Sequence, residues 1–454
     1  MWEEKYLCHQ CVGDAYVRQH IKKIGSSNQA CSYCKRKRIN IHVEHILAMM
    51  HDVFEYYFEA YEDIYDCGHG DSAQEVIYKE LGVEFEVAED IYNLLAEKFN
   101  PHNDFDGVRY NDAFVYRHIT YSTGKLSSSW RKATDSLLNE TRYFNREANA
   151  FLDSLFRDIN KLKTLDSSSP VKMLTEEIRL YRARVFENQE EVKQALEQPE
   201  KYFGPPPPSL ARSGRMNAQG ISVFYGATSV DVAIAEVRPP VGSIVVTAPF
   251  VPLRALRVLD ISALDSLSFG SGSKFDPQTR KTNERAVFFR TLSRKLTLPA
   301  FGKRQDSDYL ITQLVADFLS DRETFGLDGV SFKSTQVQAG KGYNIVLFNK
   351  SSAVRHAADE SRRFNVELYE YAEDNPYNFG PEIQLIVGVP QKKLYVGSRA
   401  FARIPEPTLR LITEGMTYHN ITGVTFITSQ APVNQGEDLI QPMPPEPFDD
   451  LSDF

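Results

Sequence analysis

The chain has 454 residues, 42% of them hydrophobic and 12% aromatic, and a formal net charge of −9. This length suits about three domains with a sizeable core. The acidic balance argues against a surface that coats nucleic acid, and no run reaches the roughly 18 apolar residues of a membrane-spanning helix.

The N-terminal segment carries paired cysteines. Its first residues, MWEEKYLCHQC, have neither the basic nor the apolar region of a signal peptide, so we expect a cytoplasmic protein. Two Cys-x-x-Cys pairs, Cys8/Cys11 and Cys31/Cys34, are separated by nineteen residues. Two such knuckles complete a closed tetrahedral site, which predicts a structural Zn²⁺ in a module over residues 1–40.

The next region, residues 41–165, has mainly helical periodicity. Apolar residues recur every three or four positions over 42–65, which predicts an amphipathic helix. Residues 71–82 offer Asp71 or Ser72 as an N-cap and Gly82 as a stop. Residues 127–162 predict one long helix or two joined helices.

After residue 165, β-branched runs alternate with short helices. We expect a mixed α/β domain over residues 170–350, so that the whole chain is of the α+β class. Strand-like runs continue through residues 351–440, where they either extend the same sheet or form an accessory layer. The proline-rich, acidic residues 441–454 are typical of a flexible tail.

One segment of the mixed domain places charge among small apolar residues. SVFYGA (222–227) predicts a strand and TSVDVAIAEV (228–237) a capped helix on which Val232, Ala233 and Glu236 share a face. A carboxylate in apolar surroundings requires a partner. Glu236 is therefore either in a functional site or in a structural ion pair with Arg182, Arg215 or Arg238.

Two further stretches belong with this segment. The strand LYRARVF places Arg182 and Arg184 on one face. LDGVSFKSTQVQAGKGYNIVLF predicts strand, polar loop and strand, with Ser334 ending the first strand and Asn344 beginning the second.

These elements, taken in chain order, resemble the RES domain, a family named for its arginine, glutamate and serine. The resemblance covers residue 180 to about residue 349 and rests on six positions: Arg182, Arg215, Tyr225, Glu236, Ser334 and Asn344. It implies a fold similar to ADP-ribosylating toxins and a toxin that destroys NAD⁺, paired with an antitoxin. The cysteine-paired helical region is similar to HEPN-like domains, whose Arg–His signature fits Arg36 with His42 or Arg38 with His45 loosely.

The resemblance also implies roles at the nicotinamide–ribose bond of NAD⁺. Glu236 would stabilise the ribosyl cation, in surroundings that exclude water. Arg215 and Arg182 would hold the pyrophosphate, and Tyr225 would either stack on nicotinamide or shape its pocket. Ser334 would bond the amide or ribose, with Asn344 behind it. The acceptor is either water or phosphate.

Two alternative functions remain open. The basic run CKRKRINIH and the HEPN likeness suggest an effector that binds or cleaves RNA or DNA, and the fold likeness suggests ADP-ribosyl transfer to a protein. An NAD⁺-destroying enzyme needs control, so we expect an antitoxin, an activating partner or the N-terminal region to regulate it. A homo-oligomer is a further open alternative for its assembly. No membrane association is expected.

Overall fold

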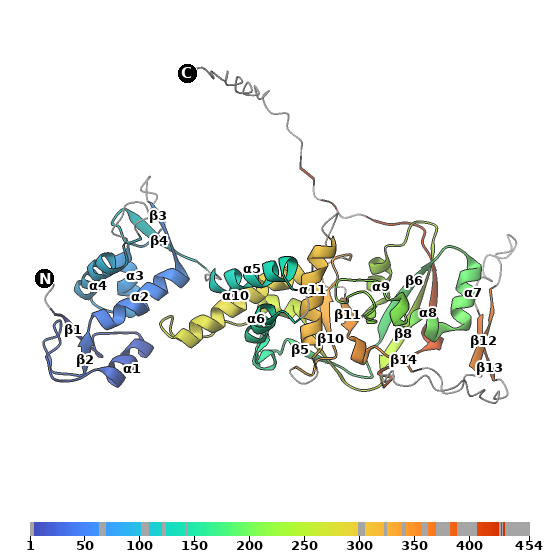
Figure 1. The fold of residues 1–454 in the computed structure, drawn as a ribbon, viewed down its shortest axis with the longest axis horizontal. Coiled ribbons are helices and arrows are strands. Elements are labelled where there is room, and N and C mark those ends of the chain that lie inside the picture. The colour runs from blue at the N-terminus through green and yellow to red at the C-terminus, as the bar shows by residue number, and fades with distance from the viewer. Residues whose placement is uncertain are drawn as a thin grey trace, which may run out of the picture.

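The computed structural model describes residues 4–62, 70–100, 109–119, 124–141, 144–297, 305–321, 325–337, 342–355, 362–368, 382–387 and 406–425, with 428, 430 and 431. Helices and strands are both abundant, and the α+β class predicted from the sequence is confirmed (Figure 1). Cys67, the tail 441–454 and the strand-like run KLYVG lie outside these residues. No helix of the described part is long and apolar enough to cross a bilayer.

The N-terminal part forms one body with a single core. Its elements are β1 (Tyr6–Cys8), α1 (Ala15–Ile24), β2 (Asn40–His42), α2 (Glu44–Tyr57), β3 (Phe58–Glu62), α3 (Ala73–Leu81), α4 (Phe85–Phe99) and β4 (Phe114–His118). Its core runs from Leu7 to Tyr116, so the cysteine-paired segment and the following helices are packed together. The two small sheets, β1–β2 and β3–β4, are antiparallel.

Local signals set two helix boundaries in this body. Ser72 caps α3 through a capping box with Glu75, and Gly82 ends it in the left-handed region at φ 61°. The helix expected over 42–65 ends at Tyr57, because the chain continues as β3, whose Phe58 pairs with His118 of β4. Pairing with a distant strand overrides the local helical pattern here.

Helices α5 (Gly124–Asn139) and α6 (Arg146–Phe156) are the two joined helices that the sequence allowed. Asn145 separates them and caps α6 by accepting from the Ala148 amide. Both pack on the later domain, because Trp130 and Phe151 share a core with residues of the large sheet. The domain boundaries expected at residues 40 and 165 remain predictions.

The remaining strands build the large sheet and a hairpin. Strands occur at β5 (Val171–Leu174), β6 (Leu180–Phe186), β7 (Phe224–Ala227), β8 (Ile244–Pro252), β9 (Leu256–Asp260), β10 (Gly329–Lys333), β11 (Tyr343–Leu347), β12 (Arg362–Glu367), β13 (Glu382–Val387), β14 (Leu409–Leu411) and β15 (Thr417–Asn420). Helices between them are α7 (Gln189–Glu197), α8 (Pro199–Phe203), α9 (Val230–Val237), α10 (Pro277–Thr297) and α11 (Gln305–Leu319). Short 3₁₀ turns are η1 (Ile159–Lys161), η2 (Pro208–Leu210), η3 (Ile261–Ser266), η5 (Asn349–Ser351) and η6 (Thr413–Gly415).

The large sheet is divided near its centre. In the described part of the chain its order is β14-β8-β6-β7-β11-β10-β9-β5, with β15 also on β8. Neighbouring strands pair over several residues, but β6 and β7 share a single pair, Tyr181 with Ala227. These two strands therefore diverge from Arg182 and Gly226 onward, which opens the sheet.

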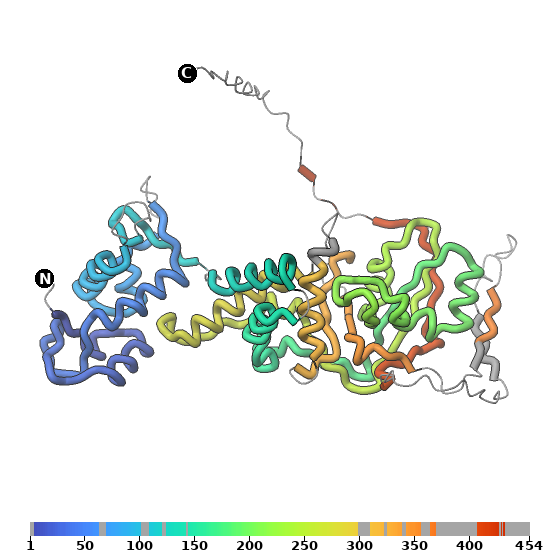
Figure 2. Tube along the Cα trace, viewed as in Figure 1, coloured from blue at the N-terminus to red at the C-terminus, as the bar shows by residue number. Residues whose placement is uncertain are grey.

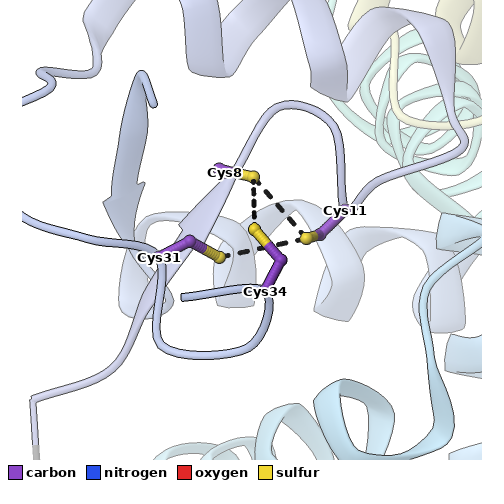
Figure 3. A group of neighbouring side chains, drawn as sticks. All are labelled: Cys8, Cys11, Cys31 and Cys34. Carbon is purple, nitrogen blue, oxygen red and sulfur yellow. Dashed lines mark hydrogen bonds between the residues drawn. The ribbon is translucent and has the colours of Figure 1, made fainter. Parts of the chain in front are cut away.

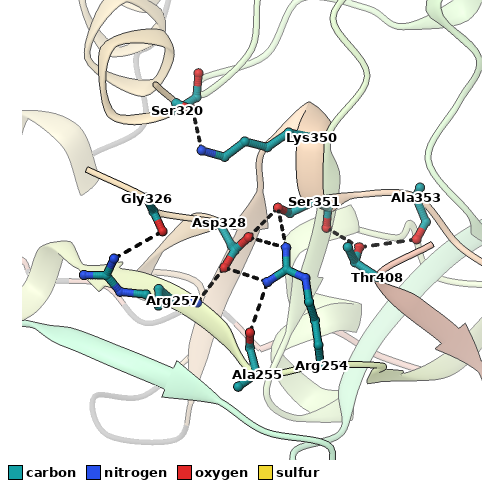
Figure 4. A network of polar contacts seen from close by, with 10 residues as sticks. All are labelled: Arg254, Ala255, Arg257, Ser320, Gly326, Asp328, Lys350, Ser351, Ala353 and Thr408. Carbon is teal, nitrogen blue, oxygen red and sulfur yellow. Dashed lines mark hydrogen bonds and ion pairs between the residues drawn. The ribbon is translucent and has the colours of Figure 1, made fainter. Parts of the chain in front are cut away.

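The sequence left open whether the segment after residue 350 extends the large sheet or forms a separate layer, and the structure shows both. β14 and β15 extend the large sheet at β8, while β12 and β13 form a separate hairpin. The strand expected at 423–429 is absent from its described residues, and β15 precedes it. Figure 4 shows the network that ties this segment down: Asp328 binds Arg254 and Ser351, and the Ser351 carbonyl accepts from Thr408.

The molecule is elongated, with the N-terminal body at one end (Figure 2). The large sheet lies towards the other end (Figure 1). Helix α10 projects from the sheet domain towards the N-terminal body (Figure 1). Phe275, just before α10, is 1% exposed within the N-terminal core. Lys274 pairs with Glu80 at 2.5 Å, and Arg280 with Asp52 at 2.9 Å. Apolar and ionic contacts thus hold the two bodies together.

Candidate active site

A pocket of about 570 Å³ lies where β6 and β7 diverge. Its walls come from β6, β7, α9, the loop before β7, α11 and the β10–β11 hairpin. Among the described lining residues, four are arginines and one is a glutamate: Arg182, Arg184, Arg215, Arg238 and Glu236. A pocket of this size and positive balance suits a ligand with phosphate groups.

Glu236 is held in a defined orientation by two neutral donors. The Asn344 Nδ2 donates to Glu236 Oε1 at 2.7 Å, and the Ser334 hydroxyl donates to the same oxygen at 3.2 Å. Asn344 lies on β11 and Ser334 directly follows β10, and they are 5% and 8% exposed. The buried β10–β11 hairpin therefore holds both donors in place. Oε2 accepts no hydrogen bond from any described residue, which leaves one carboxylate oxygen available to a ligand.

The surroundings of Glu236 differ from the sequence-based expectation in one respect. Val232 and Ala233 are buried on the shared face of α9, but Glu236 itself is exposed. The expectation that apolar neighbours keep water away from this carboxylate is therefore wrong, because α9 ends one residue later and its last turn faces the open pocket. No ion pair involves Glu236 in the described part of the chain, so the structural salt bridge is not formed there.

Arg182 is a buried cation without a counterion in the described residues. Its side chain is 7% exposed, its guanidinium lies 5.5 Å from the centre of the Phe224 ring, and Nη1 has no hydrogen-bond partner. Burial, together with the positive charge of Arg184, lowers the pKa of Arg182 well below its ordinary value. An unpaired buried cation is costly, and a bound anion would offset that cost.

Arg215 occupies the border of the pocket. Its Nη1 donates to the carbonyl of Thr297, the last residue of α10, at 2.8 Å, and its guanidinium lies 5.5 Å from the centre of the Phe332 ring. The Thr312 hydroxyl of α11 donates to the Arg215 carbonyl. Helices α10 and α11 therefore fix both the side chain and the backbone of Arg215.

Tyr225 organises the loop that carries Arg215. Its hydroxyl donates to Asn217 Oδ1 at 3.0 Å and accepts from the Met216 amide at 3.0 Å. Asn217 in turn donates to three loop carbonyls, those of Arg212, Ala218 and Ile221. Burial raises the pKa of Tyr225 to about 12, so this hydroxyl is neutral and able to donate at physiological pH.

The structure thus brings the predicted site residues into one place. Arg182, Arg215, Tyr225, Glu236 and Asn344 line the pocket, and Ser334 reaches it through its bond to Glu236. In the structure Ser334 contacts the Glu236 carboxylate, and its expected contact with a substrate amide or ribose stays a prediction. The roles of all six residues remain predictions.

Sequence reasoning left three contributors to the pocket out of the expected site. Alternation along β6 placed Arg184 on the same strand face as Arg182, but no role was assigned to Arg184. Asn217 was visible only as a polar residue after Arg215, and its four hydrogen bonds depend on the loop conformation. Tyr309 comes from α11, and nothing in the sequence indicated that this helix reaches the site.

The sulfur atoms of the paired cysteines also meet. Cys8, Cys11, Cys31 and Cys34 place their Sγ atoms within 4.8 Å of one another, with closest separations of 3.5, 3.7 and 3.9 Å (Figure 3). Four sulfurs tetrahedrally bound to one ion at about 2.3 Å would be about 3.8 Å apart. The cluster can therefore bind a metal ion.

The Arg–His pairs of the HEPN signature are not assembled into a site in the described residues. The His42 ring packs edge-on against Tyr6 and lies 3.6 Å from Glu44. In the part of the chain that the structure describes, no hydrogen bond or ion pair joins His42 to Arg36, or His45 to Arg38. The HEPN likeness thus stays a hypothesis.

A divided, mixed sheet with an arginine-lined pocket and a carboxylate held by two neutral donors defines an α+β domain with a pocket suited to a ligand that carries phosphate groups. Residues 179–367 match the family model of the RES domain, so the chain contains a RES domain. This family is linked to toxins that act on NAD⁺. No curated protein matches the chain.

Proposed function

We propose that this chain cleaves the bond between nicotinamide and ribose in NAD⁺. The observation that carries the proposal is the Glu236 carboxylate, which lines a pocket rich in arginines and is fixed through Oε1 by Asn344 and Ser334, while Oε2 has no hydrogen bond in the described residues. Arg182 and Arg215 bind the pyrophosphate, for which planar guanidinium groups are suited. Tyr225 shapes the nicotinamide end.

The bond that breaks joins C1′ of the ribose to the ring nitrogen of nicotinamide. Its electron pair goes to that nitrogen, so the cationic ring leaves as neutral nicotinamide and no acid is needed. Positive charge develops on the ribose, and Glu236 Oε2 stabilises it. Water then adds at C1′ and releases a proton to the carboxylate or solvent, giving ADP-ribose, or an oxygen of inorganic phosphate adds and gives ADP-ribose 1″-phosphate.

The test is nicotinamide release from NAD⁺ by the full-length protein, with and without phosphate. Glu236→Gln keeps the shape and both neutral hydrogen-bond partners but removes the charge. We expect its kcat to fall about 10²- to 10³-fold, while NAD⁺ binding persists. Glu187→Gln, an exposed glutamate outside the pocket, is the matched control. Equal kcat in Glu236→Gln and wild type, or no release under any condition, would contradict the proposal.

We infer further that the four cysteines hold a structural Zn²⁺. A closed set of four thiolates leaves no position for a substrate, so the ion would fix the N-terminal body rather than take part in catalysis. Removing the metal with a chelator is expected to unfold this body. Metal analysis should give one zinc per chain, lost in Cys34→Ser but kept in Cys67→Ser; zinc retained by Cys34→Ser would rule out this site.

A further inference from the structure

A second pocket, of about 670 Å³, adjoins the candidate active site. It lies among α5, α10 and α11, and Arg215 and Tyr309 line both pockets. Helix α5 precedes the matched RES segment, so one wall of this pocket comes from outside residues 179–367. The second pocket is therefore a feature of this longer chain.

The side chains of the second pocket are those that recognise a nucleotide. Trp130 lines the pocket with the part of its ring that its packing against Phe151 and Phe288 leaves exposed, 9% of the residue. The exposed carboxylate of Asp135 can accept from ribose hydroxyl groups. Arg131 and Lys295 are exposed cations suited to a phosphate. Neither cation forms an ion pair or hydrogen bond in the described part of the chain.

One polar atom at the second pocket is buried without a hydrogen-bond partner in the described residues. The hydroxyl of Thr134, which lines the pocket, is buried and makes no hydrogen bond in the described residues. A buried hydroxyl without a partner costs free energy that a bound polar ligand would recover.

We propose that the second pocket holds the nucleoside monophosphate half of the dinucleotide, while the first pocket holds the nicotinamide mononucleotide half, with its phosphate at Arg182. Arg215, at the border, binds the pyrophosphate that joins the two halves. This inference rests on the proposed function, because it assigns the far end of the same substrate. On this proposal, α5 is the part of the N-terminal region that contributes to substrate binding.

The kinetic test compares NAD⁺ with nicotinamide mononucleotide, which lacks the second nucleotide. Arg131→Glu should raise the KM for NAD⁺ about tenfold, at unchanged kcat, and leave both constants for the mononucleotide unchanged. Lys132→Glu is the matched control, because Lys132 is an exposed neighbour on α5 that does not line the pocket. An equal KM increase for both substrates, or none for NAD⁺, would overturn the proposal.

A binding test needs no turnover and so separates failure of this inference from failure of the proposed function. The chain has two tryptophans, Trp2 and Trp130. AMP should quench the fluorescence of the full-length protein, with the response lost in Trp130→Phe and weakened in Arg131→Glu. AMP should also compete with NAD⁺ for binding. AMP that binds without competing would show a separate effector site and overturn the assignment, as would absence of AMP binding.

Discussion

Glu236 lies at a helix position that ordinarily disfavours an acidic side chain. It occupies the last turn of α9, where the helix dipole presents partial negative charge and an acidic side chain is disfavoured by about 0.3–1 kcal/mol. Arg238 then ends the helix with a non-glycine residue at φ 46°. Departures from local rules concentrate at functional sites, and here the compensation comes from Asn344 and Ser334.

The hydrogen bonds to Glu236 predict unequal effects of removing its two donors. Asn344→Ala removes the 2.7 Å bond, and a bond to a charged group contributes about 1.5–3 kcal/mol. If this energy orients the carboxylate in the transition state, kcat for nicotinamide release should fall about tenfold to a hundredfold. Ser334→Ala removes the longer, 3.2 Å bond and should reduce kcat less.

Separate measurement of kcat and KM distinguishes a positioning role of Asn344 and Ser334 from a purely structural one. Both variants should keep the KM for NAD⁺ near that of the wild type, because neither side chain binds the phosphates. Asn344→Asp, which places a second carboxylate beside Glu236, should raise the pH at which activity appears. An unchanged pH profile in Asn344→Asp would argue against direct contact with a charged Glu236.

The resemblance to the RES domain, which rests on residue types in chain order, predicted six site residues, and the structure brings these six residues together at one pocket. The exposure of Glu236 could not be predicted, since it depends on where α9 ends relative to the opening in the sheet. Tyr309 could not be predicted either, because its contribution depends on the packing of α11 on the Arg215 loop.

At the scale of elements, the pocket arises from the strand pairing. Alternating patterns predicted β6 and β7, but not that they share only one residue pair. The loop at 212–221 then fills one side of the opening, held by Asn217 and Tyr225. Loop conformations of this kind depend on tertiary contacts, which is why local sequence patterns did not indicate it.

The close packing of this loop gives a prediction at Gly214. A Cβ at this position would lie 2.6 Å from Asn217 Oδ1 and 3.0 Å from the Tyr225 hydroxyl. Gly214→Ala should therefore break the Asn217–Tyr225 bond and displace Arg215, raising the KM for NAD⁺ several-fold at unchanged kcat. Gly423→Ala, where nothing lies within 4 Å, is the control. Wild-type KM in Gly214→Ala would show that the loop does not position Arg215.

At the scale of the whole molecule, α10 connects the N-terminal body to the site. Its 21 residues span about 30 Å. At its beginning, Phe275, Lys274 and Arg280 are bound by the N-terminal body; at its end, the Thr297 carbonyl accepts from Arg215. Periodicity predicted neither this contact nor the packing of α5 and α6 on the sheet domain, because both join segments far apart in the sequence.

This connection predicts that loosening the N-terminal body weakens substrate binding at a distance. Glu80→Lys places two positive charges together in a partly buried pair, since Lys274 and Glu80 are 29% and 21% exposed. We expect the contact to open, the end of α10 to lose its fixed position and the KM for NAD⁺ to rise a few-fold. Combining Glu80→Lys with Lys274→Glu restores opposite charges and should recover most of the lost affinity.

The controls separate coupling from general destabilisation. Glu89→Lys makes the same charge change at an exposed position of α4 without a partner in the described residues, and should leave KM and the unfolding temperature unchanged. If Glu80→Lys lowers the unfolding temperature but leaves KM unchanged, α10 holds the two bodies together without transmitting their contact to Arg215. In that case, any regulation by the N-terminal region would have to act by covering the pocket. If the double variant instead recovers the wild-type KM, the regulation is transmitted through α10.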